Sequence, residues 1–161
     1  MKFIVVSISV LFSLSSFAAT PVGKYTQKHQ VMAMYNNTAK KCKAEGGKWI
    51  KKEQVCVVNV SDDAEVIADG EAFSLHITTI GSNFHSCEFE GPATLVGNTL
   101  VSKVATEEYN SETGEIEPAT CELTATLSQA GKKMSIATNN KCRSFCGANG
   151  WLDVELTKVK K

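Results

Sequence analysis

The side chains of this chain that could do chemistry are six cysteines, three histidines and a group of closely spaced carboxylates. The histidines, His29, His76 and His85, are scattered along the sequence. His85 lies two residues before Cys87, but no second pair of ligands stands at the spacing of a metal site. We therefore expect no metal site and no cofactor.

Catalytic patterns are also missing from the sequence. A thiol nucleophile needs a free cysteine, and an even number of cysteines in an exported chain leaves none by default. No nucleophile elbow, phosphate-binding loop or paired histidine–glutamate helix motif occurs. Carboxylates for a glycosidase-like pair exist at Glu88, Glu90, Glu107 and Glu108, but no pattern marks a cleft around them. We expect a protein that is not an enzyme.

An export signal opens the chain and explains the cysteines. A short basic start, an apolar run from Phe3 to Leu14 and the small-x-small pattern ending at Ala18 predict a signal peptide over residues 1–18. We expect a periplasmic or secreted protein with no membrane span after cleavage. Oxidising compartments preserve disulfides, so all six cysteines are disulfide candidates. They are Cys42, Cys56, Cys87, Cys121, Cys142 and Cys146.

The pairing of these cysteines is constrained by geometry but not settled by it. Cys42 and Cys56 bracket a short segment, whose closure is worth roughly 3 kcal/mol in the chain-entropy model, and form our first predicted pair. Two cysteines that face inward from predicted strands form the second, Cys87–Cys121. The third, Cys142–Cys146, requires a turn, because four residues on a strand span about 13 Å. The competing scheme joins Cys87 or Cys121 to this turn.

Charge is distributed unevenly along the chain. Residues 19–52 hold eight lysines and one acidic residue, residues 53–123 hold fourteen acidic residues and one lysine, and residues 124–161 hold seven basic and two acidic residues. Such asymmetry concerns partners and association rates more than fold. The acidic middle argues against binding to nucleic acid.

The most concentrated part of this acidic block is a segment without apolar periodicity, residues 106–120. We expect a loop there that either is simply solvated or docks a basic protein, with tyrosine as an anchor. Its candidate partner-binding residues are Glu107, Glu108, Tyr109, Glu112, Glu115 and Glu117.

The elements that must carry these residues are mostly strands. Apolar and polar residues alternate over 121–128, 134–138 and 152–157, over 73–78 and 84–90, and turn residues such as Gly97-Asn98 separate such segments. A hairpin over 49–60 is expected to turn at 52–54, and a polar break follows at 61–65. The pattern predicts an antiparallel sandwich or small barrel of about eight strands.

The N-terminal part differs from the rest. Residues 19–29 show no periodicity, which predicts a flexible lead. From residue 30 onward Val31, Met34, Ala39 and Cys42 recur at helical spacing, which predicts one helix over Gln30–Ala44, ended by Gly46-Gly47. Residues 30–161 are then a single β domain that disulfides hold together.

Two cysteine motifs support a resemblance. The chain has Cys42-x-x-x-Gly46-Gly47-x-Trp49 and later Cys142-x-x-x-Cys146-Gly147. With its size and export signal, it resembles small disulfide-rich periplasmic or secreted β proteins of Gram-negative bacteria. Residues 70–160 are loosely similar to the β domains of periplasmic lysozyme inhibitors. The resemblance implies an inhibitor or immunity role and carries over no individual site residue.

Together these features predict a non-enzymatic exported binding protein. We expect its acidic middle to engage or inhibit a basic protein such as a cell-wall hydrolase. Two alternatives stay open, an envelope structural or assembly factor and an immunity protein against a secreted toxin.

Overall fold

The computed structural model of the chain describes residues 20–34, 38–128, 130–148 and 150–160. The predicted signal peptide therefore lies outside the described residues. The strands are β1 (Gly23–Met32), β2 (Lys48–Ile50), β3 (Val55–Asp69), β4 (Ala72–Ile80), β5 (Ser86–Val96), β6 (Thr99–Asn110), β7 (Glu115–Ser128), β8 (Lys133–Thr138) and β9 (Val154–Lys158). The helical segments are α1 (Ala39–Ala44) and the 3-10 helices η1 (Ser82–Phe84) and η2 (Asn140–Phe145). Within the described ranges no helix is long and apolar enough to cross a membrane.

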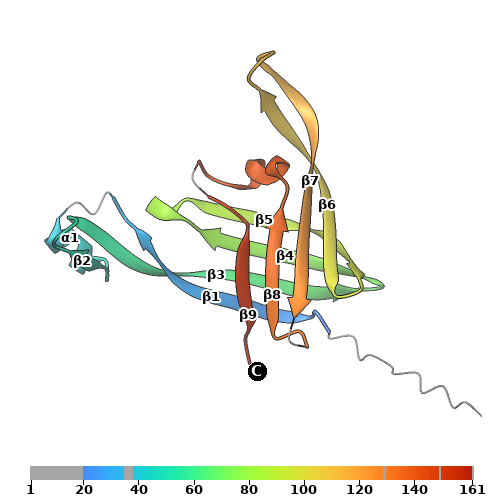
Figure 1. Cartoon of the computed structure of the whole chain (residues 1–161), viewed down its shortest axis with the longest axis horizontal. Helices are drawn as coiled ribbons and strands as arrows, with labels where there is room; N and C mark the ends of the chain where they lie inside the picture. The colour runs from blue at the N-terminus through green and yellow to red at the C-terminus, as the bar shows by residue number, and fades with distance from the viewer. Residues whose placement is uncertain (1–19, 35–37, 129, 149, 161) are drawn as a thin grey trace, which may run out of the picture.

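Eight of the strands form a closed antiparallel barrel (Figure 1). From β3 to β9 each strand pairs with the next one along the chain, and β1 closes the circle by pairing with both β9 and β3. Of the two predicted architectures the barrel is the one observed. Each of these eight strands therefore pairs with a neighbour on both sides over at least part of its length.

The barrel core follows the predicted alternation. On β7 the inward positions Cys121, Leu123, Ala125 and Leu127 are buried, while the residues between them are exposed or half-buried. The same period of two places Leu75 and Ile77, Phe89, Ile136 and Leu156 in one cluster from four other strands. Cys87 and Phe89 face inward as expected. This core holds the barrel together.

β3 is longer than predicted and leaves the barrel. The expected polar break at residues 61–65 is wrong, because β3 runs through it and pairs with both β1 and β4 there. The polar residues are tolerated because Asp63 points outward, and Asp62, which is buried, accepts a hydrogen bond from the Ile80 amide at 2.8 Å. The first part of β3 carries the predicted hairpin with β2, in which Trp49 lies opposite Cys56.

The N-terminal prediction needs correction. Most of the expected flexible lead and the start of the expected helix form β1, in which Tyr25 and Val31 are buried. Gln27 and His29, which share a strand face with them, are polar, so the sequence shows no apolar alternation there. The helix begins only at Ala39, where the Thr38 hydroxyl accepts a hydrogen bond from the Lys41 amide at 3.3 Å.

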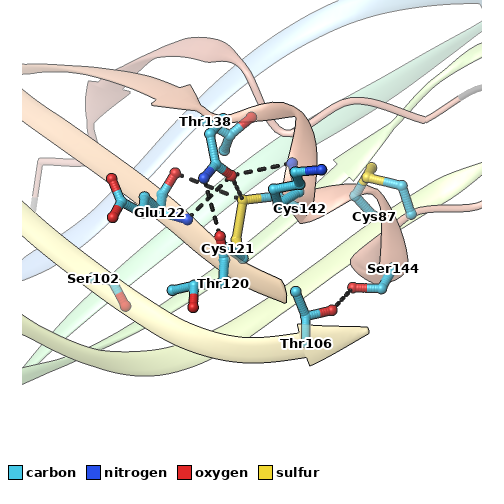
Figure 2. Close-up of a disulfide and its surroundings, with 12 residues drawn as sticks. Cys87, Ser102, Thr106, Thr120, Cys121, Glu122, Thr138, Cys142 and Ser144 are labelled. Atoms are coloured by element: carbon cyan, nitrogen blue, oxygen red, sulfur yellow. Dashed lines mark hydrogen bonds between the residues drawn. A yellow bond between two sulfur atoms is a disulfide. The ribbon is translucent and has the colours of Figure 1, made fainter. Parts of the chain in front are cut away.

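Two of the three predicted disulfides are wrong. Cys42–Cys56 is confirmed, but Cys87 bonds Cys146 and Cys121 bonds Cys142, as in the competing scheme. The segment does turn, as η2. Cys142 lies inside η2 and faces β7, whereas the backbone is already extended at Cys146, which lies beside β5. Figure 2 shows the bond from Cys121 to η2.

Candidate functional site

The acidic segment predicted as a loop is a paired β-hairpin. β6 and β7 continue beyond the barrel to Asn110 and from Glu115, with Glu108 opposite Glu117 and Tyr109 opposite Ile116. We call residues 106–119 the acidic arm. It projects from one mouth of the barrel (Figure 1). The prediction failed because both faces of the arm meet solvent, so the sequence shows no apolar alternation there.

The arm has two chemically different faces. Because side chains alternate along a strand, Glu108, Glu115 and Glu117 share the face that continues the barrel interior. The opposite face carries Tyr109 and Ile116, each 66% exposed. Glu107 and Pro118, directly across from each other, also lie on this face. The arm therefore combines an acidic face with an apolar face.

The base of the acidic face is tied to η2. Lys141 forms an ion pair with Glu108, and the Thr106 and Ser144 hydroxyls form a hydrogen bond, visible in Figure 2. η2 in turn is fixed by its disulfide to β7. Glu108 is thus partly neutralised, and its carboxylate is less available to a partner than the other four in the arm. The arm is thus attached to η2 at its base, whereas the strands of its outer part pair only with each other.

The outer part of the arm has an ordered turn. The Asn110 side chain accepts hydrogen bonds from the Glu112 amide at 2.9 Å and the Thr113 amide at 3.4 Å, and donates one to the Glu117 carboxylate at 2.8 Å. Gly114 has φ +74°, a conformation that glycine adopts without strain. A structured tip loses less conformational entropy on binding than a loose loop.

The structure therefore brings the six predicted binding residues onto one arm but divides them. Glu107 and Tyr109 lie on the apolar face, Glu108, Glu115 and Glu117 lie on the acidic face, and Glu112 lies in the turn. An open pocket of about 430 Å³ lies between the arm and Lys141.

Comparisons with protein-family models, curated proteins and solved structures give no match. The function must therefore be argued from the residues themselves.

The other chemical candidates are dispersed in the barrel. Within the described ranges no three metal-ligating side chains gather. His76 contacts Glu90 at 3.1 Å on the outer surface, and His29 lies 3.0 Å from the buried Asp62. Glu88 and Glu90 point outward from β5, whereas Glu107 and Glu108 lie on opposite faces of the arm. These four carboxylates therefore do not line one common cleft.

Sequence reasoning missed three features of the arm. Ile116 and Pro118 complete the apolar face, and Lys141 neutralises one of the acids. The turn sequence Asn110-Ser111-Glu112-Thr113-Gly114 was the available signal, since an asparagine and a glycine at this spacing are typical of a hairpin connection. Once the turn is placed between Asn110 and Glu115, the cross-strand pairs follow by counting residues outward from it along both strands.

A second open pocket lies on the other side of η2. Its volume is about 310 Å³, and Arg143, Trp151 and Asp153 contribute to its lining. The Asp153 carboxylate is engaged within the protein, because it accepts a hydrogen bond from the Thr138 amide at 2.6 Å. Trp151 is 53% exposed. The two cysteines that line this pocket, Cys142 and Cys146, are both in disulfides.

Proposed function

We propose that this protein is an exported, non-enzymatic binding protein that engages or inhibits a basic protein, such as a cell-wall hydrolase, through the acidic arm. The observation that supports it most is the arm itself. It holds five glutamates on a projecting hairpin, of which only Glu108 forms an ion pair with another described residue. Three disulfides suit an oxidising compartment outside the cytoplasm.

The two faces have separate tasks in this proposal. The charges at Glu107, Glu112, Glu115 and Glu117 attract a basic partner and raise the association rate. Tyr109 and Ile116 form an exposed apolar pair that a partner can bury, and tyrosine is enriched among residues that dominate binding energy. Charge then governs the rate of association, and the apolar pair governs how long the complex lasts.

The first test is a pull-down from envelope and culture extracts with the oxidised mature protein, eluted by a salt gradient. A basic hydrolase that leaves at moderate salt supports the proposal, since salt screens exposed charges. Recovery of an envelope assembly that only denaturant removes would instead favour the structural role considered above.

The second test uses the recovered partner on a biosensor surface. Changing Glu107, Glu112, Glu115 and Glu117 to glutamine should lower the association rate by about tenfold or more and flatten its salt dependence. Tyr109→Ala should chiefly raise the dissociation rate. Glu108 is kept, because its loss would leave Lys141 unpaired.

A matched control removes the same charge elsewhere. Asp63→Asn, Asp69→Asn, Glu71→Gln and Glu88→Gln change four exposed acids of the barrel and should leave binding nearly unchanged. Equal losses in the arm variant and this control would show that net charge, and not the arm, carries the interaction. Unchanged binding by the arm variant would contradict the proposal.

A further inference from the structure

A second projecting unit lies apart from the acidic arm. β1 and β3 extend past the barrel as a ribbon, to which β2 and α1 are added, and Cys42–Cys56 ties α1 to β3 (Figure 1). Ala33, Cys42 and Cys56 form a small core that Trp49 covers, separate from the barrel core. We call residues 38–57, with Met32, the basic ribbon end.

The basic ribbon end carries a dense positive charge. Residues 38–54 hold six lysines and two glutamates. All six lysines are exposed, and none forms an ion pair with another described residue. They are Lys40, Lys41, Lys43, Lys48, Lys51 and Lys52. The two glutamates leave this segment with a formal charge of +4.

The ribbon also presents an apolar strip beside these lysines. α1 covers the face on which Cys56 lies, so the opposite face is left open. There Met32 pairs across to Val57, Val57 pairs with Lys48, and Val55 pairs with Ile50. Met32 is 42% exposed, and Val55, Val57 and Ile50 are half-buried. Lys51 and Lys52 follow Ile50 directly in the turn.

We propose that the basic ribbon end binds the surface of an anionic lipid bilayer. Lysines attract anionic headgroups, and apolar side chains among them can reach the boundary with the acyl chains. Lys48, Lys51 and Lys52 border the apolar strip, and the three lysines of α1 add to the local positive potential. A soluble polyanion would use the lysines alone, which is why the strip favours a bilayer.

This surface is independent of the acidic arm. The two units project from different parts of the barrel, as Figure 1 shows, and bear opposite charge. A protein held on a membrane by the ribbon end leaves the arm free to meet a basic partner. The inference does not require that the arm bind anything.

The test is co-sedimentation of the oxidised protein with vesicles of phosphatidylcholine that contain phosphatidylglycerol, compared with pure phosphatidylcholine vesicles. The wild type should bind only the anionic vesicles. Changing Lys48, Lys51 and Lys52 to glutamine should lower the partition about 100-fold, because each lysine near an anionic surface contributes about a factor of five. Ile50→Ser should lower the fraction that stays bound at high salt.

Matched controls separate the ribbon from net charge. Lys132→Gln, Lys133→Gln and Lys160→Gln remove three exposed lysines from the other parts of the chain and should leave binding nearly unchanged. The arm variant described above should bind vesicles like the wild type. Circular dichroism checks that each variant is folded.

Three results would overturn the proposal. One is equal binding to neutral and anionic vesicles, and another is equal loss in the ribbon variant and the lysine control. The third is binding to soluble polyphosphate with none to vesicles, which would assign the lysines to a polyanion in solution.

Discussion

At the scale of residues, two glycines owe their place to disulfides. A Cβ at Gly47 would lie 2.5 Å from the Cys56 sulfur, and one at Gly150 would lie 2.7 Å from the Cys87 sulfur. Real side-chain carbons do not approach so closely, so a larger residue would displace the bridge. The sequence predicted Gly47 only as part of the signal that ends a helix, because nothing in it placed a sulfur atom beside that glycine.

Tyr25 gives a prediction about pH. Its side chain is fully buried, its hydroxyl donates a hydrogen bond to the Pro21 carbonyl at 2.8 Å, and burial raises its pKa above the usual value of about 10. Above that pH the unfolded chain has lost the proton that the folded chain keeps. The free energy of unfolding should therefore be unaffected below pH about 10 and fall as pH rises through the raised pKa.

The measurement is urea denaturation at stepped pH between about 8 and 11. Tyr25→Phe should cost about 1 kcal/mol at neutral pH through the lost hydrogen bond, yet lose less stability than the wild type above pH about 10. Tyr109→Phe, which alters an exposed tyrosine, should follow the wild type. If the free energy of unfolding fell equally with pH in the wild type and in Tyr25→Phe, Tyr25 would not be the cause of the stability loss above pH about 10.

At the scale of elements, strands were predictable where one face is buried and unpredictable where both faces are alike. β4, β5, β7 and β8 alternate clearly because one side packs in the core. The acidic arm is exposed on both faces, and β1 carries the polar Gln27 and His29 on the same face as its buried residues. Neither segment therefore shows an apolar period of two. Disulfide pairing was harder still, because it depends on which strands become neighbours.

The basic ribbon end should behave as a separate folding element. Its small core is distinct from that of the barrel, so Cys42→Ala with Cys56→Ala should abolish hydrogen-exchange protection in α1 and β2 while β4 to β8 keep theirs. The Cys87–Cys146 disulfide, in contrast, belongs to the barrel and does not hold together a separate local unit. Changing both Cys87 and Cys146 to alanine should therefore weaken hydrogen-exchange protection throughout the barrel, which mass spectrometry can measure. Equal effects of the two variants would mean that the ribbon and the barrel unfold together.

At the scale of the whole molecule, the charged blocks of the sequence lie on separate parts of the fold. The basic first block lies largely on the ribbon end, and the densest part of the acidic block forms the arm. The composition showed that such blocks exist, but only closure of the barrel by β1, a pairing distant in sequence, decides where they project. A binder of basic proteins and a membrane-surface protein are compatible in one chain because these units are apart.

Stability of the whole domain should depend on oxidation. The three bridges close loops with sequence separations of 14, 21 and 59 residues, each worth about 3–4 kcal/mol in the chain-entropy model. Together they rival the total of about 5–15 kcal/mol that a domain of this size has. We expect reductant to abolish the cooperative thermal transition seen by circular dichroism. A cooperative transition that persists when all six thiols are shown to be free would mean that barrel packing alone sustains the fold.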